Sequence, residues 1–271
     1  MDSAPPDALA LRRGVLAASV LHDVPVEPGS DGVRVGASWD DRAGWTSASW
    51  SELATALDGA DPESMPGRLR LRDWLRSRAW ACAGAGERRL VALALPTGHV
   101  LHPGDSWVVD RVLGGVLDVG PGLVPDTGGL AAPLHRSAVP PGRLDLADRW
   151  PVLRGRVEDL AERALERLSD DASRVLRPVG GADVLTLLGA RVLRAHLATG
   201  DGTGLRAVAV PMRSRAWFDL ARIDPAFVGA AATATAPEER GLASPLLVTV
   251  DEVAVVPRPA DPARLARTCL S

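Results

Sequence analysis

Apolar residues recur at helical spacing near the start of the chain and then give way to short β-branched runs. Ala8 to Val20 carries a broad stripe of Leu and Val, which predicts an amphipathic helix. Val33 to Trp39 and Trp45 to Trp50 flank a polar loop and predict a β-hairpin. Ser49 stands three residues before Glu52, which is the spacing of a capping box, so a short helix is expected to follow.

The next segments predict a long helix and then several strands. Pro66 to about Ala83 has apolar residues at helical spacing, and glycines end it. Arg89 to Leu95 is largely apolar and predicts a buried strand. Trp107 to Val119 predicts one bent strand or two, with the pair Gly114-Gly115 as the bulge or turn. Gly120 to Arg143 is rich in Gly and Pro and predicts a long loop.

The second half predicts further helices and strands. A helix is expected to begin at Pro151, since proline suits the first helical position. A second helix is predicted over Ala182 to Thr199. Strands are predicted at Leu205 to Val210 and at Leu246 to Val256. The Ala-rich stretch from Ala226 to Ala236 predicts one more helix.

This order of elements favours the α+β class. Helices and strands are mixed in each half without a regular βαβ alternation, so we expect a mixed or antiparallel sheet packed against several amphipathic helices. The Gly/Pro-rich stretch permits an N-terminal α+β region over 1–140 and a C-terminal one over 141–271. One continuous core is the alternative.

Composition removes several kinds of chemistry. All 31 positive residues are Arg, and the chain has no Lys, Asn, Gln or Tyr, a bias typical of a GC-rich, bacterial genome. Schiff-base and P-loop lysines, tyrosine acids and amide oxyanion donors are therefore excluded. Catalysis would have to use Asp, Glu, His, Ser, Thr, Cys, Arg or backbone groups.

Charge and cysteine content predict an ordinary cytoplasmic protein. A formal net charge of −3 gives no reason to expect binding to nucleic acid or to an anionic membrane. No run approaches the roughly 18 apolar residues of a membrane helix, and the acidic start of the chain does not resemble a signal peptide. Cys82 and Cys269 are too far apart for a CxxC pair and give little reason to expect a disulfide. We expect no cofactor.

The segment His99-Val-Leu-His102-Pro-Gly-Asp105 is the strongest candidate for chemistry. Histidine moves protons near neutral pH, so His102 and Asp105 are the candidate catalytic acid–base pair. His99 and Arg111 are candidate ligand-binding residues beside that pair. Pro103 interrupts the segment, so its histidines do not share a continuous helix, and we expect no metal site. The alternative is a turn in which His102 and Asp105 bond to local backbone.

A second candidate segment follows the predicted strand at Leu205 to Val210. Arg213 and Arg215 could grip a carboxylate or phosphate, with Trp217 as a further ligand-binding residue. The alternative is that the aromatic side chains of this segment pack in the core while its arginines are solvated. An active centre of this kind requires His102, Asp105 and Arg213 to meet around one pocket.

The predicted helix from Pro66 combines arginine and tryptophan. Pro66 to Leu90 carries seven Arg against two acidic residues, whereas residues 1–65 carry four Arg against eleven. Pairing between these regions, or plain solvation, is one interpretation. The other is a docking face for an acidic protein or a nucleic acid, with four candidate partner-binding residues: Arg68, Arg72, Trp74 and Arg76.

Three functions remain open from the sequence. The leading hypothesis is a non-catalytic module that binds another protein, and it predicts an exposed apolar patch rimmed by Arg. The rival is a small-molecule enzyme with a His/Asp acid–base pair and an Arg anion clamp. The third is a nucleic-acid accessory protein working through Arg68 to Arg78, for which we expect steep salt dependence. Oligomeric state is not predicted.

Overall fold

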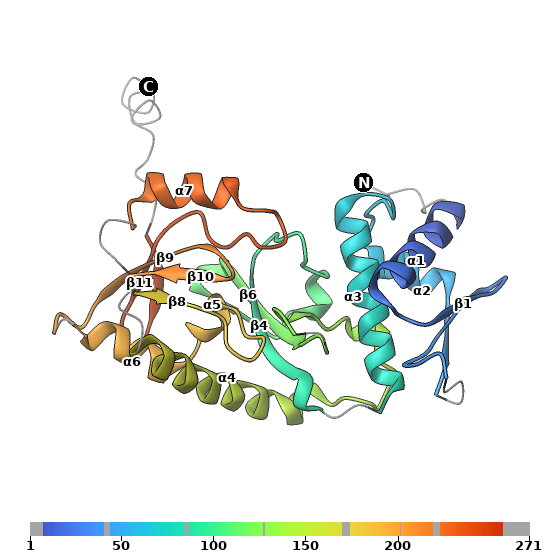
Figure 1. Cartoon of the computed structure of the whole chain (residues 1–271), viewed down its shortest axis with the longest axis horizontal. Helices are drawn as coiled ribbons and strands as arrows, with labels where there is room; N and C mark the ends of the chain where they lie inside the picture. Colours follow the sequence, from blue (N-terminus) through green and yellow to red (C-terminus); the bar gives the residue numbers. More distant parts are fainter. Residues whose placement is uncertain are drawn as a thin grey trace, which may run out of the picture. The chain divides into compact units, whose positions relative to one another are not determined.

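The protein is an α+β structure of helices and antiparallel strands (Figure 1). Its chain divides into two compact units. The computed structural model describes residues 8–40, 44–84, 87–126, 128–169, 174–200, 202–218 and 223–256. The first unit comprises Met1–Val157 with Gly180–Ala182, and the second comprises Glu158–Val179 with Asp183–Ser271. Every strand pair in the described sheets is antiparallel, as the α+β prediction allowed. The division of the sequence near residue 140 stays a prediction.

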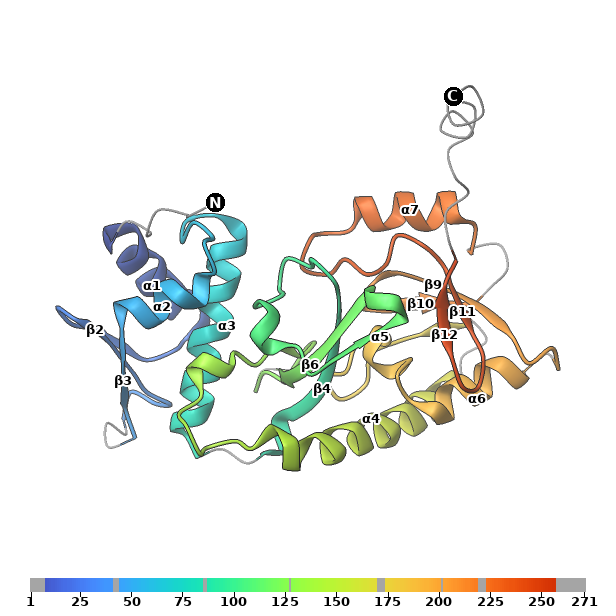
Figure 2. The same cartoon turned by 180° about the vertical axis from the view of Figure 1, so that it is seen from behind.

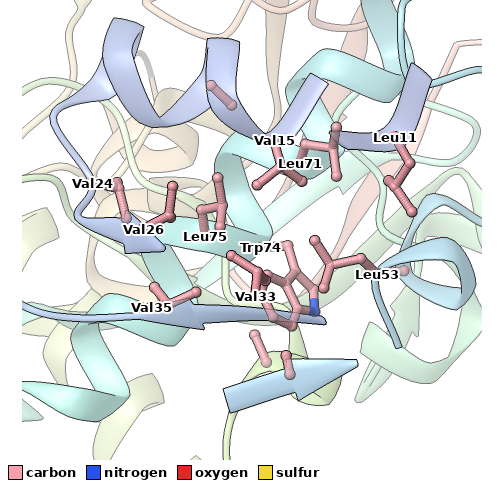
Figure 3. Packing of buried hydrophobic residues seen from close by; sticks show 14 of the residues in the cluster. Leu11, Val15, Val24, Val26, Val33, Val35, Leu53, Leu71, Trp74 and Leu75 are labelled. Carbon is pink, nitrogen blue, oxygen red and sulfur yellow. The ribbon is translucent and has the colours of Figure 1, made fainter. Parts of the chain in front are cut away.

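The first unit begins with a small sheet covered on one face by three helices. The strands, in the order β1-β2-β3, are Val26–Pro28, Gly32–Val35 and Thr46–Ser49, and the helices are α1 (Ala8–His22), α2 (Trp50–Leu57) and α3 (Met65–Cys82). Figure 3 shows Trp74 of α3 among Val33, Leu53 and Leu71 in the core that these elements share. The predicted hairpin is confirmed, since β2 pairs with β3 from Gly32↔Ser49 to Val35↔Thr46.

Local capping explains where these helices begin. Ser49 accepts the backbone N–H of Glu52 while Glu52 accepts that of Ser49, so the predicted capping box of α2 is confirmed. Ser64 accepts the backbone N–H of Gly67 and caps α3, with Pro66 in the first turn as expected. The first helix, α1, ends two residues beyond the predicted Val20.

A second sheet in the first unit has the order β4-β6-β5, with β7 pairing to β6 (Figure 2). Its strands are Leu90–Pro96 (β4), Asp110–Val112 (β5), Leu117–Leu123 (β6) and Ala132–Pro133 (β7). The predicted loop from Gly120 is wrong at its start, because β6 continues through Gly120-Pro-Gly122 and pairs with β4 along its whole length. The indole of Trp107 lies against Gly120, where an added Cβ would be 2.4 Å from Trp107 Cε2, so this glycine permits close packing within a strand.

The second unit contains a five-stranded sheet in the order β12-β11-β9-β10-β8. Its strands are Val175–Leu176 (β8), Arg206–Met212 (β9), Arg215–Trp217 (β10), Leu246–Val248 (β11) and Val253–Val255 (β12). Three helices belong to its sequence: α5 (Val184–Leu187), α6 (Arg191–Thr199) and α7 (Pro225–Ala234). Helix α4 (Leu146–Ser169) runs across the boundary between the units.

Several predicted boundaries differ from the structure for local reasons. Pro151 lies inside α4, because the helix begins earlier, at Leu146. The single helix predicted over Ala182 to Thr199 is two, since the backbone of Ala190 is extended between α5 and α6. The strand predicted at Leu246 to Val256 is a hairpin of β11 and β12.

Candidate functional site

The histidine that the sequence singles out is held by a buried aspartate. His102 Nε2 lies 3.0 Å from Asp118 Oδ2, and Asp118 is 1% exposed. Gly104 donates its backbone N–H to His102 Nδ1 at 3.1 Å, so Nε2 carries the proton that Asp118 accepts. The imidazole also lies edge-on to the ring of Trp107, with 5.3 Å between the ring centroids. Both ring nitrogens of His102 are therefore engaged.

Arg111 joins the two aspartates of this cluster. Its Nε donates to Asp118 Oδ1 at 2.9 Å, and its Nη2 donates to Asp105 Oδ1 at 2.6 Å. The charge of Asp118, and then the hydrogen bond to it, raises the pKa of the Arg111 guanidinium. Asp105 thus contacts Arg111, while His102 contacts Asp118. A joint acid–base role for His102 and Asp105 stays a prediction.

The remaining contacts of the cluster fasten a turn onto the second sheet. Thr97 Oγ1 lies 3.3 Å from Asp118 Oδ2, and buried His99 accepts the backbone N–H of Leu101 at its Nδ1. In this arrangement His102 can exchange a proton with a substrate only by releasing Asp118 or Gly104. The geometry therefore holds one histidine tautomer in place and leaves neither nitrogen facing a ligand.

The second predicted segment lies in the other unit. Arg213 is 2% exposed, and its Nε donates to Asp183 Oδ2 at 2.6 Å, while Asp183 Oδ1 caps α5 through Thr186. Trp217 is buried, and the side chain of Arg215 is exposed with no hydrogen bond or ion pair to the described residues. Asp219, which follows in the same segment, lies outside the described residues. A meeting of Arg213 with His102 and Asp105 stays a prediction.

The arginine-rich helix predicted as a docking face is α3, and most of its arginines bind the protein itself. Arg68 donates to the carbonyl of Glu63, and Arg70 donates to the carbonyls of Leu57 and Asp58. Arg72 bonds both carboxylate oxygens of its neighbour Asp73, at 2.7 and 3.2 Å. Trp74 is fully buried in the core.

Arg78 makes the most extensive of these internal contacts. Its guanidinium donates to Thr46 Oγ1 at 2.8 Å, to the Ser47 carbonyl at 2.5 Å and to the Ala138 carbonyl at 3.2 Å. These bonds satisfy the Ser47 carbonyl on the edge strand β3 and fasten the strand to the 3-10 turn Arg136–Ala138. Arg76 is different: its side chain is half-buried and has no hydrogen bond or ion pair within the ranges that the structure describes.

Helix α1 presents the largest group of exposed apolar side chains on one described helix. Leu9 is 58% exposed, Leu16 43%, Val20 81% and Leu21 72%, whereas Leu11 and Val15 are buried in the core. Leu9, Leu16 and Val20 are spaced by seven and four residues, so they form one row along the helix. Sequence analysis placed Leu9, Leu16 and Val20 on the same apolar stripe as the core residues.

Arg12 lies beside this exposed row, and Arg13, four residues after Leu9 and three before Leu16, lies within it. Arg13 forms an ion pair with Glu63 at 2.8 Å, in which both side chains are more than half exposed. Arg12 Nη2 donates to the Ser30 carbonyl at 2.9 Å, and its guanidinium carbon lies 5.3 Å from the ring centroid of Trp50. We name Leu9, Leu16, Val20 and Leu21 with these two arginines the α1 face.

A buried histidine lies beneath α3. His135 is 3% exposed, and its Nε2 has no hydrogen-bond partner in the described part of the chain. Burial, and secondarily the charge of Arg70, lowers the pKa of His135 to about 3. Its backbone N–H donates to Ser77 Oγ at 3.0 Å. This histidine is neutral at physiological pH and cannot act there as a general acid.

Within the described ranges no group of three or more His, Cys, Asp or Glu could hold a metal ion. Cys82 is a free thiol within hydrogen-bonding distance of Thr46, and Cys269 lies outside the described residues. No described helix combines the length and the apolar character needed to cross a membrane.

Searches against protein-family models, curated proteins and solved structures found no match.

Sequence reasoning missed Asp118 and the division of the stripe on α1. A lone aspartate within the apolar run Val116 to Val119 was the available signal, because a buried carboxylate requires a partner. Which partner it finds depends on the pairing of β5 with β6, which sets Arg111 opposite Asp118. The exposed half of the stripe on α1 carried no such signal.

Proposed function

We propose that this protein is a non-catalytic binding module whose α1 face takes an amphipathic helix of a partner protein. The observation that carries the proposal is the exposed row Leu9, Leu16 and Val20, extended by Leu21. Four large apolar side chains together offer on the order of a few hundred Å², the size at which an exposed patch marks an interaction site. An apolar row on a helix fits the apolar row of a second helix.

The rim of the α1 face favours an acidic partner. Among the described residues, the Arg13 side chain is held by Glu63 alone in an exposed ion pair, and such pairs contribute about 0–1 kcal/mol. A partner carboxylate can therefore replace Glu63 at little cost. A second copy of this chain is disfavoured, because two α1 faces would bring their arginines together.

The rival catalytic hypothesis has less support. An acid–base group needs a nitrogen or oxygen within reach of the substrate, and both nitrogens of His102 are engaged by Asp118 and Gly104. The nucleic-acid hypothesis also weakens, because four of the five arginines between Arg68 and Arg78 bind groups of this chain.

The test is photocrosslinking from the α1 face. A benzophenone amino acid at Leu16 should give an adduct with one cellular protein that contains an acidic amphipathic helix, whereas the same group at exposed Phe227 of α7 should not. The partner is then purified and its affinity measured by calorimetry. Leu16→Glu with Val20→Glu should weaken binding about 100-fold, with an unchanged circular dichroism spectrum.

Two results would count against the proposal. One is an adduct between two copies of this chain, which would make the α1 face a homodimer interface. The other is full affinity of the double glutamate variant for the crosslinked partner, which would place the interface elsewhere.

A further inference from the structure

A cavity of about 270 Å³ lies inside the first unit, beside α3. Its volume is near the lower end of small-molecule pockets. One wall is α3, and the others come from the segment after α1 and from the ends of β6 and β7. Much of the lining is apolar, including Val24, Pro25, Trp80, Leu123 and Pro133. Such a lining suits the apolar body of a ligand.

Two of the three aspartates that line the cavity, Asp73 and Asp126, are paired with arginines, whereas the cation Arg76 is not. Asp73 is held by Arg72 at 2.7 Å, and Asp126 is held by Arg89 at 2.6 Å. Arg76 also lines the cavity, and its guanidinium has no hydrogen bond or ion pair to any described residue. Burial, then the charge of Arg72, lowers the pKa of Arg76, with Asp73 opposing and Arg89 adding to this effect. An anion beside Arg76 would relieve the cost of that burial.

A second donor is available on the same wall. Trp80 is 3% exposed, and its indole Nε1 has no hydrogen-bond partner among the residues described. Buried donors are normally satisfied by protein, water or ligand. Trp80 follows Arg76 by four residues, so the two side chains lie one above the other on α3.

We infer that this cavity binds a small organic acid, with its carboxylate on the Arg76 guanidinium and its apolar body against Trp80 and the prolines. A planar carboxylate matches the two parallel donors of a guanidinium. A polyphosphate fits poorly, because a single guanidinium, that of Arg76, would face several phosphate charges while Asp23 also lines the cavity. The inference does not depend on the function proposed for the α1 face.

The first experiment uses the unaltered full-length protein. Phenylacetate and phenylacetamide have nearly the same shape and differ in charge, so they separate recognition by Arg76 from plain apolar binding. Calorimetry and saturation-transfer NMR at neutral pH should detect phenylacetate at concentrations up to about 10 mM, with the amide bound about tenfold more weakly or not at all. Equal binding of acid and amide, or no binding of the acid, would overturn the inference.

The second experiment locates the site. Arg76→Met keeps the apolar stem and removes the charge, so it should weaken phenylacetate binding about tenfold or more. Arg68→Met is the matched control, since Arg68 is exposed on the same helix and does not line the cavity. Retained affinity in Arg76→Met, or equal losses in both variants, would show that the acid binds elsewhere. The acid–amide comparison still decides the matter if a variant does not fold.

Discussion

Helices α1 and α3 pack together in one unit, yet they differ in which side chains they bury and which they expose. In α3 both tryptophans are buried and four of five arginines bind groups of the chain. In α1 half of the apolar stripe faces outward. The arginine-rich helix is thus mainly internal, and the apolar helix supplies the free surface.

The difference shows how arginine can serve a protein that has no lysine. A guanidinium has five N–H donors in a planar fork, so one buried side chain can satisfy several backbone carbonyls. Arg78 does this for Ser47 and Ala138. A run of positive charge in the sequence therefore need not mark a docking surface.

Substituting the core tryptophan of α3 should have the largest effect on stability. Trp74→Ala removes a fully buried side chain from the core and should lower the free energy of unfolding by about 4 kcal/mol. Leu16→Ala on the α1 face should change it by less than about 0.5 kcal/mol. Urea unfolding followed by circular dichroism measures both, and similar losses would contradict the contrast between the helices.

Removing the internal arginine should have the next largest effect. Arg78→Met leaves three acceptors, on Thr46, Ser47 and Ala138, without their donor, so we expect a loss of about 2–3 kcal/mol. Arg68→Met serves as the surface control, with an expected change within about 0.5 kcal/mol. The same unfolding titration tests the pair. An Arg78→Met protein as stable as the control would mean that these bonds add nothing.

The buried histidine beneath α3 should make stability depend on pH. Because the folded-state pKa of His135 is about 3 and the unfolded value is about 6.5, the unfolded chain takes up the proton first as pH falls. The contribution of neutral His135 to the free energy of unfolding is therefore fully present above a pH of about 6.5. About 2 kcal/mol of the free energy of unfolding should be lost by pH 5.

The measurement is urea unfolding of the wild type and of His135→Leu at pH 7 and at pH 5. The free energy of unfolding of His135→Leu, relative to that of the wild type, should rise by about 2 kcal/mol between pH 7 and pH 5. His196→Leu, at an exposed position of α6, is the control and should show no such growth. A constant difference for His135→Leu would contradict a neutral buried imidazole.

Local signals sufficed for much of the fold. The capping box at Ser49, the hairpin of β2 and β3 and the apolar run of β4 follow from residues close in sequence, and the structure confirms them. The loop predicted from Gly120 was wrong at its start, because Gly120 admits the indole of Trp107 and Gly122 lies against Leu93, so neither glycine serves a turn. Sequence alone does not distinguish these two uses of glycine.

The candidate sites were less predictable, because long-range pairing determines them. His102 could be singled out by its chemistry, but its partner Asp118 is set by the register of β5 and β6. The arginines of α3 could be counted, but their acceptors lie on other elements, such as Thr46 for Arg78. Which half of the stripe on α1 faces the core depends on where α3 packs.

The smallest expected change in the free energy of unfolding is that of Arg76→Met, although Arg76 lies only two positions before Arg78 on α3. Arg76 has no partner in the described structure, so Arg76→Met removes a half-buried charge without breaking a bond, and unfolding should change by less than about 0.5 kcal/mol or shift toward higher stability. Arg78→Met is the matched comparison, and urea unfolding of both variants gives the difference directly. A loss of 2 kcal/mol or so for Arg76→Met would mean that its charge is compensated within the chain. In that case, an uncompensated cation would no longer explain an acid bound in the adjoining cavity.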